Sequence, residues 1–252
     1  MAEIILIRHG QASFGADNYD RLSTLGRQQS ILLGQHLKDH EQTFDRLICG
    51  TMVRHTETAD GIFQGFGQAV PIESTALLNE YRFQGLLGQL KAQYPARWVD
   101  TGDARRDYYH NMKLALTYWM QGAIQTDGED NWRSFRQRVR EGFGFACGQG
   151  ARRILLVSSG GPIAVILASV LGLDDKRLRN LILQVKNTST SRLLYSRGDS
   201  EPVTRTHPSP GTPPGTPPGT PPDVSPDRFT LDGFNDVGHL LSVEQPHNVT
   251  FA

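Results

Sequence analysis

An arginine and a histidine stand directly after the first hydrophobic segment of this chain. Residues 3–7 read Glu-Ile-Ile-Leu-Ile, a nearly continuous apolar run that is typical of a strand buried on both faces. Arg8 and His9 follow it, and Gly10 lets the backbone bend or another group come close. Open α/β sheets hold their ligands at the carboxyl ends of strands, so a guanidinium and a titratable ring are candidates for chemistry there. The alternative is that both residues only end the strand and face water.

Two further segments offer places for an anion. A strand at residues 46–49 is followed by a helix that Thr51 could cap, which puts Arg54 in the first helical turn. Backbone N–H groups and the positive helix dipole favour an anion there, although a solvated arginine is the commoner outcome. A strand at residues 153–157 runs into Ser159-Gly160-Gly161 and then an apolar helix, a turn whose amides also suit an anion. The three segments therefore converge on one edge of a sheet.

The elements that must position these residues alternate between strand and helix patterns, which favours an α/β fold. We expect one domain over residues 1–252, a three-layer sandwich with a mostly parallel central sheet and helices on both faces. Besides the strands above, the patterns predict helices at residues 24–39, 131–148 and 163–171 and strands at residues 70–72, 190–195 and 228–231.

Two segments depart from this alternation. Residues 82–127 read as helical and are unusually rich in aromatic and basic side chains, which indicates a helical insertion near the site. Most of these side chains should pack as ordinary helix contacts, and a minority could face a substrate. Residues 199–226 include three Gly-Thr-Pro-Pro repeats, a composition that cannot bury a core, so we expect a disordered hairpin loop within the domain.

Composition narrows the choice of partners. Lysine plus arginine (26) equals aspartate plus glutamate (26), so no overall field favours nucleic acid or an acidic membrane surface. The two cysteines have no metal-like or redox-like spacing, and no run approaches membrane-spanning length. We expect a soluble, cytoplasmic protein that binds a small molecule and neither nucleic acid nor membrane, with its oligomeric state open.

Several short motifs occur in a fixed order along the chain. They are Arg8-His9-Gly10-Gln11, Leu22 to Gln28, Arg54 to Ala59, Leu78-Asn79-Glu80, Gly128-Glu129 with Arg138-Val139, and Phe234 to Leu240. In this order they resemble the motifs of the histidine phosphatase superfamily, the phosphoglycerate mutase-like proteins. The resemblance covers the chain apart from the Pro-rich segment, and it implies a phosphoglycerate mutase-like fold.

The resemblance also implies catalytic roles. His9 would attack phosphorus and carry the phosphoryl group, while Arg8 and Arg54 would hold its non-bridging oxygens. Glu80 would protonate the leaving oxygen and then activate water, for which its carboxyl needs a raised pKa. No metal or cofactor is implied, since the arginines and helix N-termini supply the positive charge. The ligand would be a small phosphorylated substrate or inorganic phosphate.

Further phosphate-binding candidates are Gln11, Arg21, Ser159 and Gly160. One of them departs from the family pattern, which reads Val-Ser-His-Gly-Gly where this chain has Val-Ser-Ser-Gly-Gly at residues 157–161. Ser159 thus stands where the resemblance implies a second pocket histidine. A hydroxyl still donates one hydrogen bond, but it is shorter and carries no positive charge, and losing one oxyanion donor costs on the order of 10²–10³ in rate.

The sequence therefore predicts a metal-independent phosphomonoester phosphatase acting through phospho-His9, with activity that Ser159 could reduce. A mutase and a catalytically weak phosphate-binding module are the alternatives. His55 is a possible compensating donor, although a structural role on the next face of its helix is the more ordinary expectation. A serine hydrolase that uses Ser159 is disfavoured, because Val157 occupies the first glycine position of the nucleophile elbow.

Overall fold

A six-stranded sheet forms the centre of the molecule. The computed structural model describes residues 2–13, 20–125, 130–148, 151–196, 225–241 and 248–251. The strands are β1 (Ala2–Arg8), β2 (Arg46–Cys49), β3 (Ile72–Ser74), β4 (Arg153–Ser158), β5 (Thr190–Tyr195) and β6 (Phe229–Asp236). Their order across the sheet is β3-β2-β4-β1-β5-β6, so the first strand of the chain lies inside the sheet.

The sheet is mixed, with a parallel part and an antiparallel edge. β3, β2, β4 and β1 run parallel to one another, whereas β5 is antiparallel to β1 and to β6. The register pairs Arg8 with Ser158, so the loops that follow β1 and β4 leave the sheet side by side. This arrangement confirms the mostly parallel α/β sheet that the sequence predicts, and it brings the first and third candidate segments together.

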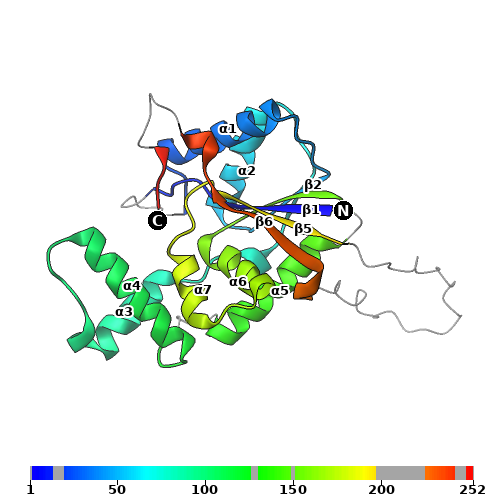
Figure 1. Cartoon of the computed structure of the whole chain (residues 1–252). Helices are drawn as coiled ribbons and strands as arrows, with labels where there is room; N and C mark the ends of the chain where they lie inside the picture. The colour runs from blue at the N-terminus through cyan, green and yellow to red at the C-terminus, as the bar shows by residue number, and fades with distance from the viewer. Residues whose placement is uncertain are drawn as a thin grey trace, which may run out of the picture.

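Helices cover both faces of the sheet (Figure 1). α1 and α2 lie on one face, and α5, α6 and α7 lie on the other, while α3 and α4 extend beside the carboxyl ends of the parallel strands. Their bounds are α1 (Thr24–Asp39), α2 (Val53–Phe66), α3 (Phe83–Gln93), α4 (Ala104–Met120), α5 (Trp132–Cys147), α6 (Gly160–Leu171) and α7 (Asp175–Ile182).

Alternate side chains of β1 build two separate cores. Ile5 and Ile7 pack in the apolar cluster that includes Leu33 of α1 and Ile62 of α2. Ile4 and Leu6 belong to the larger cluster on the opposite face, which α3 to α6 also enter. Successive residues of a strand point to opposite faces, so a strand covered by helices on both sides is apolar throughout.

Several element boundaries differ from the sequence-based expectation, and α6 begins at Gly160 rather than at residue 163. β3 lies at residues 72–74 rather than 70–72, and β6 extends to Asp236. α2 begins at Val53 after Met52 and has no side-chain cap, because the Thr51 hydroxyl instead accepts a hydrogen bond from the Asn79 amide. Arg54 nonetheless lies in the first turn of α2, as the sequence predicts.

The region between β3 and α5 is helical but broken into parts. α3 and α4 are joined through a short 3-10 turn at Pro95–Arg97. Leu86, Leu90, Met112 and Trp119 of these helices are buried in the larger core, so much of the segment packs against the domain. Gly128 and Glu129, and most of the Pro-rich segment at residues 199–226, lie outside the described residues.

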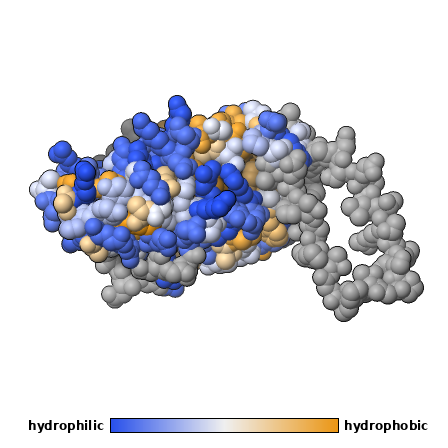
Figure 2. Space-filling model, turned by 90° about the horizontal axis from the view of Figure 1, so that it is seen from below, coloured by the Kyte–Doolittle hydropathy of each residue, from blue (hydrophilic) through white to orange (hydrophobic). Residues whose placement is uncertain are grey.

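The surface seen from below is mostly hydrophilic, and its hydrophobic residues occupy small, separate areas (Figure 2). In the part of the chain that the structure describes, no helix is both long enough and apolar enough to cross a membrane.

Candidate active site

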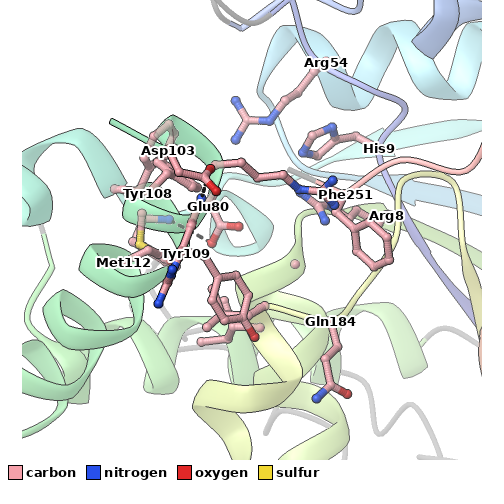
Figure 3. A pocket seen from close by; sticks show the side chains of 17 residues that line it. Arg8, His9, Arg54, Glu80, Asp103, Tyr108, Tyr109, Met112, Gln184 and Phe251 are labelled. Atoms are coloured by element: carbon pink, nitrogen blue, oxygen red, sulfur yellow. Dashed lines mark hydrogen bonds between the residues drawn. The ribbon is translucent and has the colours of Figure 1, made fainter. Parts of the chain in front are cut away.

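A cavity of about 540 Å³ lies at the carboxyl edge of the parallel strands. Arg8, His9, Arg54, Glu80 and Gly160 all contribute to its lining. They come from the end of β1, the first turn of α2, the loop before α3 and the start of α6. Figure 3 shows His9 and Arg54 on the sheet side of this cavity, with side chains of α4 across from them. The structure thus brings together residues that the sequence separates by up to about 150 positions.

Hydrogen bonds hold both the ring and the backbone of His9 in place. Its ring nitrogen Nδ1 lies 2.6 Å from the Gly10 carbonyl oxygen. Its backbone N–H donates to the Ser158 carbonyl oxygen at 2.8 Å, and its own carbonyl oxygen accepts from the Asn187 amide at 3.1 Å. A carbonyl oxygen can only accept, so Nδ1 carries the ring proton in this contact and Nε2 holds the lone pair.

The electrostatic surroundings of His9 favour the neutral ring. Burial lowers the pKa of His9 well below its usual range, and the charges of Arg54 and Arg8 lower it further. At neutral pH the imidazole is therefore an unprotonated base with its lone pair at Nε2. Such a ring can act as a nucleophile without first losing a proton.

Arg8 and Arg54 are both almost fully buried, which is unusual for arginine. Arg8 donates from Nη1 to the Val185 carbonyl oxygen, so its guanidinium is held against the segment that follows α7. Arg54 donates from Nη1 to Asp20 Oδ1 at 2.6 Å and lies with Nη2 at 3.4 Å from Ser159 Oγ. Fixed guanidiniums facing one cavity are a suitable site for the oxygens of a phosphoryl group.

Asp20 is a residue that the sequence analysis did not single out. Its second carboxylate oxygen, Oδ2, accepts from the Val53 backbone N–H at 2.9 Å, which partly satisfies the open start of α2. The same carboxylate therefore anchors both the helix and the Arg54 guanidinium. An acidic residue in a polar loop gives no sequence signal that would identify this role.

Two backbone amides donate hydrogen bonds to the Glu80 carboxylate. Its Oε2 accepts from the Gly161 N–H at 3.0 Å and its Oε1 from the Tyr81 N–H at 3.2 Å. Burial raises the pKa of Glu80, although the Gly161 hydrogen bond and the charges of Arg54 and Arg8 offset part of this. The proton of this carboxyl is held to a higher pH than in water, as a general acid requires.

Ser159 and His55 lie in contact just beyond the cavity lining. Both side chains are fully buried, and His55 Nε2 lies 2.8 Å from Ser159 Oγ. The His55 ring also approaches His9, with 5.8 Å between the ring centroids. The expectation that His55 turns to the next face of its helix is therefore not what the structure shows.

The two remaining candidates for phosphate binding lie at different distances from the cavity. Gln11 lines an adjoining hollow together with Arg8 and His9, and its side-chain oxygen accepts from the Ser23 hydroxyl. Arg21 is not among the lining residues of either hollow. Its side chain is 62% exposed, and its Nε lies 3.8 Å from Glu57.

The far wall of the cavity is contributed by α4 and its N-terminal cap. Asp103, Arg105, Tyr108, Tyr109 and Met112 line it. Phe251 reaches the same cavity from the end of the described chain and also lines the adjoining hollow. Of these features, only the aromatic and basic character of the α4 segment is recognisable in the sequence.

Within the described residues, no group of three or more histidine, cysteine, aspartate or glutamate side chains is arranged to hold a metal ion. Positive charge at the cavity comes from the guanidiniums of Arg8, Arg54, Arg105 and Arg106 and from the first amides of α6. A phosphate dianion fits this lining by charge and by donor type.

A family model and a known phosphatase match parts of this chain. A model of the histidine phosphatase superfamily (branch 1) matches residues 4–206, which is most of the chain. The mitochondrial serine/threonine-protein phosphatase Pgam5 of Caenorhabditis briggsae is 38% identical over 77 residues. That match covers 31% of this chain and 27% of the length of that protein.

Solved structures share the fold at low sequence identity. The alpha-ribazole phosphatase of Shigella flexneri is 22% identical, with a TM-score of 0.57 and coverage of 77% of this chain and 91% of that one. Phosphoserine phosphatase of Entamoeba histolytica, solved with 3-phosphoglyceric acid, is 18% identical, with a TM-score of 0.58 over 96% of this chain and 100% of that one. These likenesses establish the fold.

Proposed function

The chain belongs to the histidine phosphatase superfamily, and from this premise we propose that it is a phosphomonoesterase that works through a phosphohistidine on His9. Arg8 and Arg54 hold the transferred phosphoryl group, and Glu80 handles the proton. The single observation that carries the proposal is the convergence of these four side chains on one cavity. No metal takes part, because the guanidiniums supply the positive charge.

The first half-reaction forms the covalent intermediate. His9 Nε2 attacks phosphorus while the bond between phosphorus and the ester oxygen breaks. The Glu80 carboxyl gives its proton to the departing oxygen, and an alcohol leaves. The guanidiniums of Arg8 and Arg54 donate to the non-bridging oxygens, where negative charge is spread in the transition state.

The second half-reaction releases phosphate. The Glu80 carboxylate takes a proton from a water molecule, whose oxygen attacks the phosphorus of phospho-His9. The phosphorus–nitrogen bond breaks, its electron pair returns to Nε2, and inorganic phosphate leaves. His9 and Glu80 are then back in their starting protonation states.

Turnover of p-nitrophenyl phosphate tests this proposal. His9→Ala should lower kcat by about 10⁴-fold or more, because the nucleophile is removed. The exposed His40 serves as a matched control, and His40→Ala should leave kcat unchanged. Equal activity of wild type and His9→Ala would remove the proposal.

Two alternatives, a mutase and a phosphate-binding module that Ser159 motivates, are separated by product analysis. A mutase would convert one phosphoglycerate into its isomer rather than release phosphate. A phosphate-binding module would bind inorganic phosphate and show no turnover over a panel of phosphoesters. We expect net release of phosphate from a small phosphorylated ester, because water has access to the cavity from the adjoining hollow.

A further inference from the structure

The Ser159 hydroxyl does not cap the helix that it precedes. Ser159 is the N-cap residue of α6, yet its side chain makes no hydrogen bond to the first amides of that helix. The hydroxyl instead lies 2.8 Å from His55 Nε2 and 3.4 Å from Arg54 Nη2, both on α2. The start of α6 is thereby tied to the first turn of α2, at the phosphoryl site.

These contacts have a direction. A guanidinium only donates, so Ser159 Oγ accepts from Arg54. Burial and then the Arg54 charge lower the pKa of His55 well below its usual range, so its ring is neutral. A neutral ring that carries its proton on Nδ1, beside the Gly50 backbone, accepts at Nε2, and the Ser159 proton then points to His55. The order of donation is Arg54 to Ser159 to His55.

The His55 ring is itself held in place. A side chain on Gly50 would overlap His55 Nδ1 and would approach Asn79 Oδ1 to 2.8 Å, so the Gly50 backbone closes that side. The ring is fully buried, and burying an imidazole without a partner costs about 1–3 kcal/mol. The sequence places an imidazole at residue 55 and a small hydroxyl at residue 159, and the fold fits one against the other.

Arg54 is thus held from two sides. Asp20 binds Nη1 at 2.6 Å on the open side, and Ser159 lies against Nη2 on the buried side. The ion pair with the Asp20 carboxylate is the stronger of these two contacts. Without the contact to Ser159, the carboxylate would therefore draw the Arg54 guanidinium toward the loop. A shift of about 1 Å in such a group can cost on the order of 10²-fold in rate.

We propose that His55 is a positioning residue of the phosphoryl site, which acts through the Ser159 hydroxyl to hold the Arg54 guanidinium toward the cavity. The buried His55–Ser159 pair therefore acts on Arg54 rather than as a donor to the phosphoryl group. This inference rests on the proposed function, because its readout is phosphoryl transfer, but its contacts are independent of which phosphoester is the substrate.

A double-mutant cycle tests the pair. His55→Ala and Ser159→Ala should each lower kcat/KM for p-nitrophenyl phosphate by about 10–100-fold, and the double variant should be little worse than either single one. His55→Gln, whose amide can reach the Nε2 position, should stay within about 10-fold of wild type. Full additivity of the two single losses would overturn the proposal.

Relocating the imidazole separates positioning from mere packing. In His55→Ala combined with Ser159→His, the new ring enters the space that His55 vacates, and a ring nitrogen can again accept from Arg54. We expect this variant to recover at least 10-fold of the activity that His55→Ala loses. Ser159→His alone should be less stable and less active, because two rings then compete for one space. No recovery in a folded double variant would overturn the proposal.

Controls distinguish failure of this inference from failure of the proposed function. His9→Ala reports on the reaction, and thermal unfolding of each variant reports on folding. If His9→Ala abolishes turnover and His55→Ala does not change it, the positioning role alone is wrong. If the wild type turns nothing over, titration with inorganic phosphate takes over as the readout, and an unchanged Kd in His55→Ala overturns the positioning role.

Discussion

The two sides of the cavity are built in different ways. On the sheet side, Arg8, His9 and Arg54 are at most 6% exposed, and hydrogen bonds to distant parts of the chain fix them. On the α4 side, Arg105 is exposed and Tyr109 is 47% exposed, although their helix is anchored in the core by Met112 and Trp119. If the proposed function is right, we expect the reaction to take place on the sheet side and substrates to be selected on the α4 side.

The sheet side also shows how a buried polar site can be stable. Several buried donors and acceptors meet partners from other elements, such as Gly161 for Glu80 and Asn187 for the His9 backbone. Removing one partner leaves the other desolvated, which costs more than the hydrogen bond itself contributes. Changes on this side should therefore act on every substrate, whereas changes on the α4 side should act on some substrates more than others.

Glu80→Gln should give the largest contrast between substrates of different leaving group. Without an acid, an alkyl phosphate must expel an alkoxide, so its kcat should fall by about 10³-fold. The p-nitrophenolate of p-nitrophenyl phosphate leaves without a proton, so its first half-reaction should be far less affected. Single-turnover release of the alcohol measures this step. Equal losses for both esters would contradict the assignment of Glu80 as the acid.

Gly161→Ala should disturb the same carboxyl by crowding. A Cβ there would overlap the Glu80 carboxylate and lie 2.8 Å from Tyr81 Cε1. The carboxyl has to leave its seat, so kcat should fall by about 10–100-fold. Gly88 of α3 is the matched control, because nothing lies within 4 Å of the Cβ that alanine would add. Gly88→Ala should leave kcat unchanged and stabilise the helix by about 1 kcal/mol.

Stability should depend on pH through the buried histidines. Burial lowers the pKa of His9 and His55 well below 6.5, and it lowers the pKa of His239 to about 4. Below about pH 6.5 the unfolded chain binds protons at these rings and the folded chain does not. The free energy of unfolding should therefore be highest above pH 6.5 and should fall as the pH is lowered toward 4. The limiting slope is about 1.4 kcal/mol per pH unit for each ring.

Urea unfolding at pH 7 and pH 5.5 measures this slope. Between these two pH values the unfolded ring is only partly protonated, so His55→Gln should reduce the difference in unfolding free energy by about 1.2 kcal/mol. Gly88→Ala, which removes no titratable group and adds a Cβ with nothing within 4 Å, provides the comparison and should leave the slope as it is. A wild-type protein that is equally stable at both pH values would show that these rings are not buried in the neutral form.

Arg105→Ala and Tyr109→Ala on the α4 side should give the smallest effects. Both side chains line the cavity from an exposed helix face, so each contributes about 0.5–1.5 kcal/mol to binding of particular esters. We expect KM to change by about 3–10-fold for some members of a phosphoester panel, with kcat for p-nitrophenyl phosphate preserved. A uniform loss of kcat over the panel would contradict the division between the two sides.

Strand and helix periodicity predicts much of the fold. The residues of β1, β2 and β5 and the bounds of α1 agree with the sequence patterns, because each combines an apolar pattern with a clear boundary residue. Ser23, for example, caps α1 by accepting from the Gly26 N–H at 3.0 Å. β3 has mostly exposed side chains at the sheet edge, so hydrophobic patterning gives it a weaker boundary.

The position of His9 relative to the sheet could be predicted, whereas its supporting contacts could not. A residue directly after a buried strand must lie at the sheet edge, whatever the rest of the chain does. The His55–Ser159 contact depends on the rotation of α2 about its axis, and the Asp20–Arg54 ion pair depends on the path of a polar loop. Both are set by tertiary packing, which leaves no local pattern.

Trapping of the covalent intermediate tests the central claim most directly. Wild type and Glu80→Gln are mixed with excess p-nitrophenyl phosphate, quenched in alkali within milliseconds and digested, and the peptides are analysed by mass spectrometry. We predict a phosphoryl group on His9 that acid removes, and its larger accumulation in Glu80→Gln, where attack by water is slowed. Continued turnover with no phosphoryl group on His9, or with one on Ser159 instead, would contradict the account.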